Sequence, residues 1–236
     1  GRSALTLAIQ RGYESTATAL IEQGADFNQS LLHASSRGHA QVVQFLLNHG
    51  AEVNWHSEQE QTALILASRG AHWETVRLLI ENHADPNLMD NRGRTALMHA
   101  VLTGNPRVVR LIQHGLQLTE GAADDGGNTP LILAASRGYL PVLETLLNET
   151  PELNAANHKG QTALMLAALN GKVECARALL AGGADRTLRA TGGGGDEGKT
   201  ALEIAQHWGK AEVAALLEAL LSPSEKVEWE KTKAEI

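Results

Sequence analysis

The chain has 236 residues and a formal net charge of -7; 43% of its residues are hydrophobic and only 3% are aromatic. This composition indicates a folded chain whose core is built from Leu, Ala, Val and Ile. An acidic chain without a dense Lys/Arg cluster binds phosphates poorly, so nucleic acid is not expected as a partner. No stretch reaches the roughly 18 apolar residues of a membrane span, so no membrane partner is expected either.

The single cysteine, Cys175, cannot form an internal disulfide, which favours a reducing, cytoplasmic location. No signal peptide is visible. The chain starts at Gly1 without a methionine, which indicates a piece of a longer protein whose targeting signals could lie elsewhere. We expect it to be a monomer.

One phrase recurs along the chain. It holds a Ser, Thr or Gln, a small residue, a leucine, further apolar residues and an alanine, with a glycine nine residues after the start in most copies. The copies start at residues 3, 29, 62, 95, 129, 162 and 200, and are 26, 33, 33, 34, 33 and 38 residues apart. This recurring spacing of 33 indicates an array of structural repeats.

Each repeat has a first and a second half with apolar residues at helical spacing, which predicts two short amphipathic helices. The glycine in the middle separates the two helices, and a later glycine ends the second. The sequence therefore predicts an all-α solenoid of helix-turn-helix units.

The copy at 127–147 carries the clearest family signature. It contains Gly127-Asn128-Thr129-Pro130-Leu131, then Ala134-Ala135, Gly138 and Leu146-Leu147. This segment resembles the ankyrin repeat family, whose unit is a β-turn and two antiparallel helices with the motif T-P-L-H-x-A. The resemblance covers residues 1–221 and implies a solenoid of about seven repeats with short β-hairpin fingers, followed by a charged tail or linker at 222–236.

The copies depart from the family motif in several places. The proline is kept only at Pro130, and the histidine at the fourth position is replaced by Thr6, Leu32, Ile65, Met98, Ile132, Met165 and Glu203. We expect the five apolar replacements to pack in the core. The short first gap predicts that the finger between repeats 1 and 2 is missing. Ala71 and His83 stand where the two glycines of repeat 3 belong.

The second half of the array is also uneven. Repeat 4 ends irregularly at residues 116–119, and a glycine-rich insertion at 192–195 predicts a flexible loop before repeat 7. Ser222-Pro223-Ser224 stops the last helix. The tail around Trp229 alternates Glu and Lys, which indicates a short charged helix.

Residues 193–200 match the phosphate-binding pattern G-x-x-x-x-G-K-[ST]. We interpret them as part of a finger, because no buried strand precedes them and Asp196 and Glu197 would repel phosphate. The ten histidines show no ligand-like spacing, and Cys175 is expected to be a buried, inert thiol. The sequence therefore predicts no catalytic residue, no cofactor and no metal site.

The resemblance implies that a partner docks on the groove and the finger tips. Arginines recur just before the mid-unit glycine, with Arg69 one position early, and further candidates lie on fingers or are tryptophans. The candidate partner-binding residues are Arg11, Arg37, Arg69, Arg137, Arg92, Arg94, Lys159, Trp55 and Trp208. They predict an acidic or extended peptide as ligand. The alternative is that these arginines are solvated residues near helix C-termini.

Three function classes follow. The first is a non-catalytic scaffold that binds another protein. The second is a regulatory ankyrin segment of a larger enzyme, channel or secreted effector. The third, an enzyme that binds a nucleoside triphosphate through residues 193–200, has only the short motif in its favour.

Overall fold

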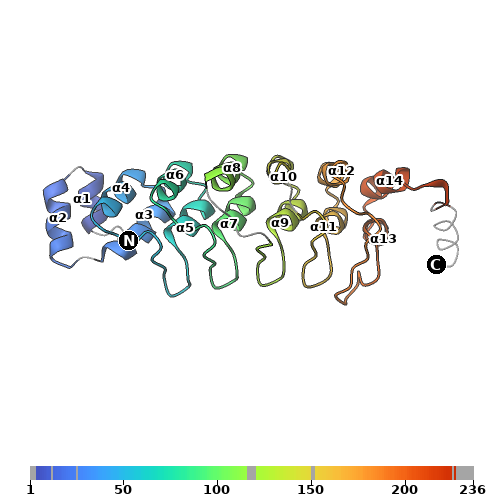
Figure 1. The fold of residues 1–236 in the computed structure, drawn as a ribbon, viewed down its shortest axis with the longest axis horizontal. Helices are drawn as coiled ribbons and strands as arrows, with labels where there is room; N and C mark the ends of the chain where they lie inside the picture. Colours follow the sequence, from blue (N-terminus) through green and yellow to red (C-terminus); the bar gives the residue numbers. More distant parts are fainter. Residues whose placement is uncertain are drawn as a thin grey trace. The chain divides into compact units, whose positions relative to one another are not determined.

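The structure is a computed structural model that describes residues 4–11, 13–24, 26–115, 121–149, 152–224 and 226. Its helices belong to two compact units, Gly1–Asp125 and Gly126–Ile236 (Figure 1). The first unit contains α1 (Ala4–Gln10), α2 (Glu14–Glu22), α3 (Phe27–Arg37), α4 (Ala40–Asn48), α5 (Ala63–Arg69), α6 (Trp73–Glu81), α7 (Ala96–Thr103) and α8 (Pro106–Gly115). The second contains α9 (Pro130–Arg137), α10 (Leu140–Leu147), α11 (Ala163–Leu169), α12 (Val173–Ala181), α13 (Ala201–His207) and α14 (Ala211–Ala219).

Within each unit the helices form two rows. In the first unit α5 packs between α3 and α7, while α6 packs between α4 and α8. The second unit repeats this pattern with α11 between α9 and α13, and α12 between α10 and α14. Fingers descend from the first-helix row in Figure 1, and isolated antiparallel bridges close three of them, at His56–Thr62, Met89–Thr95 and Ala156–Thr162. This arrangement confirms the predicted helical solenoid with hairpin fingers.

Where the repeat phrase starts with a threonine, this threonine caps the first helix. In five repeats its hydroxyl oxygen accepts a hydrogen bond from the backbone N–H three residues later, at 3.3–3.4 Å; the threonines are Thr62, Thr95, Thr129, Thr162 and Thr200. A helix leaves its first N–H groups without partners, and a hydroxyl at this position satisfies one of them. The recurring threonine is thus a helix cap.

The fourth motif position is part of the core, as predicted. All five apolar replacements are at most 3% exposed; they are Leu32, Ile65, Met98, Ile132 and Met165. Glu203, the acidic exception, accepts a hydrogen bond from the Thr200 N–H and completes a capping box. The side chain of Thr6 lies outside the described part.

Repeat 3 adopts left-handed backbone without glycine. Gly38 ends α3 with a φ of 71°, whereas Ala71 and His83 reach φ values of 53° and 62° at the positions where glycine was expected. Glu60, in the finger before α5, adds a third at 57°. Left-handed backbone costs a residue with a Cβ atom about 1–2 kcal/mol. Among the residues the structure describes, all non-glycine residues with positive φ lie in this repeat or in the finger that precedes it.

The start of repeat 2 differs from the expectation. The sequence pattern places the repeat start at Gln29, but α3 begins at Phe27 and is capped by Asp26, whose Oδ1 accepts the Gln29 N–H at 2.8 Å. The missing finger leaves Asp26 as the capping side chain, so the helix starts earlier. The irregular end of repeat 4 at 116–119 and the tail around Trp229 lie outside the described residues.

Candidate partner-binding site

The first unit contains a hollow of about 450 Å³ where two fingers meet the first helices of repeats 3 and 4. Gln59 and Gln61 line it from the finger before α5, and Arg69 lines it from the end of α5. The finger before α7 contributes Arg92 and Arg94. Three of the nine candidate residues are therefore brought together.

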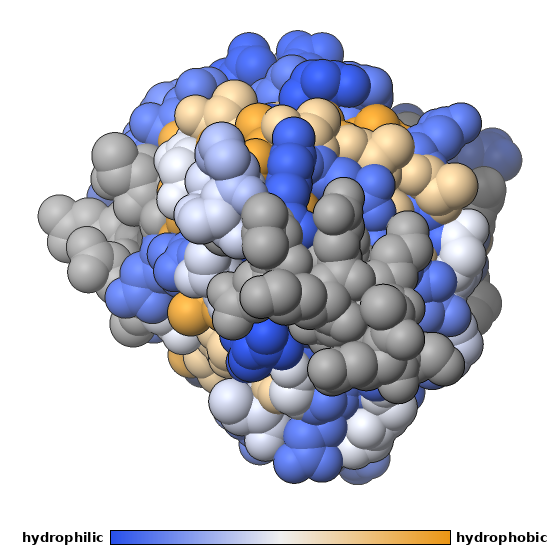
Figure 2. Space-filling model, turned by 90° about the vertical axis from the view of Figure 1, so that its right-hand side faces the viewer, coloured by the Kyte–Doolittle hydropathy of each residue, from blue (hydrophilic) through white to orange (hydrophobic). Residues whose placement is uncertain are grey.

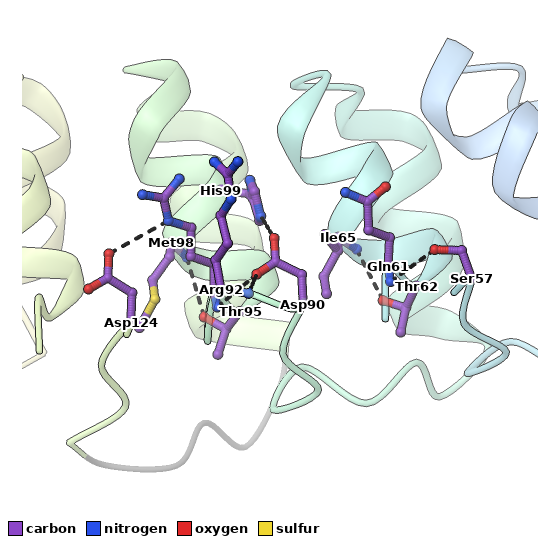
Figure 3. Close-up of polar contacts among 11 residues, drawn as sticks. Ser57, Gln61, Thr62, Ile65, Asp90, Arg92, Thr95, Met98, His99 and Asp124 are labelled. Carbon is purple, nitrogen blue, oxygen red and sulfur yellow. Dashed lines mark hydrogen bonds and ion pairs between the residues drawn. The ribbon is translucent and has the colours of Figure 1, made fainter. Parts of the chain in front are cut away.

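Asp90 organises the finger that carries these two arginines. Its Oδ1 accepts hydrogen bonds from the Arg92 N–H at 2.9 Å and the Arg94 N–H at 3.1 Å. Its Oδ2 lies 2.8 Å from His99 Nε2 on α7 (Figure 3). Because a carboxylate can only accept, Nε2 carries the proton of this hydrogen bond. Asp90 thus fixes the finger and joins it to α7.

The same finger position carries an acceptor in other repeats. Ser57 Oγ accepts the Gln59 and Gln61 N–H groups at 3.2 and 3.3 Å. Asn157 Oδ1 accepts two N–H groups of its own finger, both at 3.0 Å. All of these residues lie five positions before the repeat threonine. Sequence reasoning missed this position, although aligning the copies would have revealed Ser, Asp or Asn there in four of them.

The electrostatics of the hollow favour a neutral imidazole and an ionised carboxyl. Burial lowers the pKa of His99, and the Arg69 and Arg94 charges lower it further, against the opposing effect of Asp90. Burial alone would raise the pKa of Asp90, but its hydrogen bonds from His99 and the finger N–H groups hold it below its ordinary value. Three arginines and one buried carboxylate then leave a net positive lining in an acidic chain.

The arginines differ in how many contacts their side chains make with other residues of the chain. Arg69 and Arg92 are exposed, and neither side chain makes a hydrogen bond or ion pair with another residue in the described ranges. Arg94 is half-buried and forms an ion pair with the buried Asp124, although the 3.6 Å between Nε and Oδ2 is longer than a hydrogen bond. Arg69 and Arg92 therefore bring cationic donors to the hollow that no residue in the described ranges uses.

The other candidates of the first unit lie outside this lining. Arg11 follows α1 and Arg37 is the last residue of α3; both are exposed. Trp55, in the finger before α5, is half-buried. Arg37 comes immediately before Gly38, the left-handed residue after α3. Arg69 comes two positions before Ala71, the equivalent left-handed residue after α5, so Arg69 lies one position earlier in its repeat than Arg37 does.

The second unit holds the remaining candidates. Arg137 is the exposed last residue of α9, and Lys159 is exposed on the finger before α11. Trp208 ends α13 and is 50% exposed, but its Nε1–H donates to Asp196 Oδ1 at 2.8 Å. Viewed from the end that carries α14, this unit shows apolar residues interspersed with hydrophilic ones (Figure 2).

Residues 190–199 form a lengthened finger before α13. The Ala190 N–H donates to Lys199 O at 3.0 Å, and the Gly198 N–H donates to Ala190 O at 2.8 Å. Lys199 Nζ donates to Gly195 O, within the finger. The Thr200 N–H at the start of α13 donates to Glu203 Oε2 at 2.6 Å, so the amide that would face a phosphate is occupied by a carboxylate. These contacts support the interpretation of 193–200 as a finger.

The remaining chemical candidates are structural. Cys175 is buried in α12, and burial raises the pKa of its thiol. No group of three or more His, Cys, Asp or Glu side chains within the described ranges is arranged to hold a metal ion. In that part of the chain no helix combines the length and apolar character that a membrane span requires.

Two rows of short helices with threonine caps and fingers define a repeat protein, and sequence comparison identifies its class. The family model described as "Ankyrin repeats (3 copies)" matches residues 31–122, 72–157 and 149–224, and the model "Ankyrin repeat" matches residues 1–30. The chain belongs to the ankyrin repeat family. Ankyrin repeats are general protein–protein interaction modules.

Several curated proteins share segments with this chain. It is 38% identical over 96 residues to "Ankyrin repeat and SAM domain-containing protein 6" of Rattus norvegicus, which covers 40% of this chain and 11% of that protein. It is 36% identical over 105 residues to "Probable E3 ubiquitin-protein ligase XBOS33" of Oryza sativa subsp. japonica, 44% of this chain and 19% of the relative. "NAD-capped RNA hydrolase NUDT12" of Homo sapiens is 38% identical over 85 residues, 36% of this chain and 17% of the relative. The chain thus matches less than a fifth of each relative.

Proposed function

We propose that this chain is a non-catalytic, cytoplasmic scaffold that binds a partner protein through the fingers and the adjoining ends of the first helices. The partner presents an extended, partly acidic segment. The observation that carries the proposal is the hollow lined by Arg69, Arg92 and Arg94 in a chain whose net charge is -7. Arginine is enriched among residues that dominate binding energy, and opposite charges speed association.

The recurring arginines at helix ends extend this surface beyond the hollow. Arg37 on α3 and Arg69 on α5 are exposed and come from neighbouring first helices that pack together. A segment that runs across successive repeats would pass both. Arg137 lies in the second unit and is a candidate there in its own right.

The test is a selection of short random peptides on the immobilised chain, followed by affinity measurements with the double variant Arg37→Glu/Arg69→Glu. We expect the selected peptides to bind the double variant at least about tenfold more weakly, since two cations become anions. The matched control is Arg77→Glu/Arg110→Glu, which changes the same charge at exposed positions of α6 and α8. Equal affinity for both double variants would refute the role of the arginines, and failure to select any peptide would refute the binding function.

A second candidate is a regulatory ankyrin segment within a larger protein. It is favoured by the relatives, which include proteins named as a ubiquitin ligase and an RNA hydrolase and are all much longer than the matched part. The length of the complete reading frame tests it. A frame that encodes a catalytic domain beside the repeats would support the regulatory role, and one that ends with the repeats would exclude it.

A further inference from the structure

The hollow has exposed arginines as cationic donors, and the carboxylates beside them are buried. Asp90 is the carboxylate of its lining, and that side chain is 4% exposed and already accepts three hydrogen bonds. Asp124 lies behind Arg94 and is 5% exposed. The guanidinium groups of Arg69 and Arg92 are exposed and face no acid among the described residues at hydrogen-bond distance. The open side of the hollow therefore attracts an anion.

The donor types match a carboxylate. A guanidinium offers parallel N–H groups that fit the two oxygens of a carboxylate, and such charge-assisted bonds are stronger than neutral ones. The side-chain amides of Gln59 and Gln61 add neutral donors on the opposite finger. The backbone of both fingers is fixed by Asp90 and Ser57, so the hollow is built before a ligand arrives.

We infer that this hollow seats one carboxylate of an acidic side chain in an extended peptide, held by Arg69, Arg92 and Arg94. This inference rests on the proposed function, because it assigns one anchoring position within the partner-binding surface. The size of the hollow, about 450 Å³, suits one side chain and its neighbouring backbone.

Carboxylate binding is linked to protonation of His99. The charged groups that act on this imidazole are Asp90 on the finger, Arg94 on the same finger and Arg69 on α5. The two arginines disfavour the imidazolium, and a bound carboxylate offsets their field. The pKa of His99 therefore rises on binding, and the complex takes up a fraction of a proton at mildly acidic pH.

The experiment starts from peptides selected from a random library on the whole chain. Each is titrated by calorimetry, alongside versions with one Glu→Gln or Asp→Asn change. Neutralising one acidic position is expected to weaken binding about tenfold or more, and Arg92→Gln or Arg94→Gln in the chain is expected to do the same. Combining the peptide and chain changes should cost less than the product of the two single effects, because both remove the same contact. Arg110→Gln, an exposed arginine of α8 outside the lining, is the matched control and should leave affinity unchanged.

The possible outcomes distinguish the carboxylate-binding role of the hollow from the general partner-binding function. If peptides bind but no acidic position matters, or if Arg92→Gln and Arg94→Gln bind as tightly as the unmodified chain, the seat is wrong and the scaffold function stands. Arg92→Gln keeps the test valid if Arg94→Gln destabilises its finger. A phosphoserine at the acidic position that binds more than about tenfold better than glutamate would overturn the choice of carboxylate. Failure to select any peptide would overturn both proposals.

The proton linkage gives a second, independent readout. Titrations at about pH 6 in two buffers with different ionisation enthalpies measure the protons taken up on binding. We expect uptake with the unmodified chain and with His33→Gln, and none with His99→Gln. Equal uptake by the His99→Gln variant would exclude the proposed coupling.

Discussion

His99 Nε2 and Asp90 Oδ2 lie 2.8 Å apart although the residues are nine positions apart in the chain. Both side chains are less than a tenth exposed. The bond joins α7 to the finger that precedes it (Figure 3), and both residues line the arginine-lined hollow. The geometry of the proposed carboxylate seat therefore depends on this pair.

Removal of the Asp90 carboxylate should destabilise the first unit. Asp90→Ala leaves three donors without their acceptor, so we expect the free energy of unfolding to fall by about 3 kcal/mol. Asp90→Asn should cost only about 1 kcal/mol, since Asn157 makes the equivalent two backbone contacts in its own finger. Urea unfolding followed by circular dichroism measures both. A loss of less than about 1 kcal/mol for Asp90→Ala would show that the carboxylate contacts do not stabilise the finger, and an equally large loss for both variants would show that an amide cannot replace the carboxylate.

Stability should decrease in acid through His99 and then Asp90. A histidine with a lowered pKa when folded binds fewer protons than in the unfolded chain, so its stabilising effect is full above 6.5 and falls as the pH drops through that value. The lowered pKa of Asp90 adds a second loss below 3.8. The stability is measured as the urea midpoint of unfolding at a series of pH values. In the His99→Gln variant, the midpoint should fall less than in the unmodified chain as the pH drops through 6.5. The pKa of His33 is also lowered, by burial and by Arg37, so His33→Gln should flatten the same part of the pH dependence, and the double variant His33→Gln/His99→Gln should flatten it more than either single change. An unchanged pH dependence for His99→Gln would contradict the role of this histidine.

Relief of left-handed backbone should stabilise repeat 3. Ala71 has a φ of 53°, and Ala71→Gly should raise the free energy of unfolding by about 1 kcal/mol. The reverse change at the equivalent position, Gly38→Ala, should lower it, because the new Cβ would lie 2.6 Å from His72 Nδ1 and the backbone there has a φ of 71°. Thermal unfolding of both variants provides the measurement. A destabilising Ala71→Gly would mean that the entropy of the unfolded chain outweighs the strain.

Asp196 should hold the glycine-rich finger. Its two carboxylate oxygens accept hydrogen bonds from Gln161 Nε2 at 3.0 Å and Trp208 Nε1 at 2.8 Å. Asp196→Ala should speed amide hydrogen exchange at 190–199 and leave exchange in the first unit unchanged. The effect on overall stability should be about 1 kcal/mol, since Asp196 and Trp208 are partly exposed although Gln161 is buried. Unchanged exchange of the finger would show that its own turns suffice.

The repeat pattern predicted the fold because the same physical requirements recur in each copy. Most repeats share a helix cap, an apolar fourth position and a left-handed residue between their helices, and these appear as Thr95, Met98 and Gly104 in repeat 4. Ala71 was placed correctly at a glycine position from spacing alone. The spacing did not show where α3 begins, because its cap is Asp26, three residues before the start of the repeat phrase at Gln29.

The site was predicted less completely than the fold. Arg69, Arg92 and Arg94 were named as candidates, but the sequence did not show that they share one hollow. Whether the three arginines lie together depends on how the finger packs against the end of a helix. The contact between Asp90 and His99 fixes the finger on α7. Neither residue stood out, because a histidine one position after the family's usual site has no precedent in the motif and buried pairing is not visible from spacing.

Hydrogen exchange of the chain with and without a selected acidic peptide tests the central claim most directly. We expect binding to protect amides in both fingers of the hollow, at 57–61 and 90–94, and Arg92→Gln to weaken this protection. Protection confined to the second helices α6 and α8, or to the second unit, would contradict it.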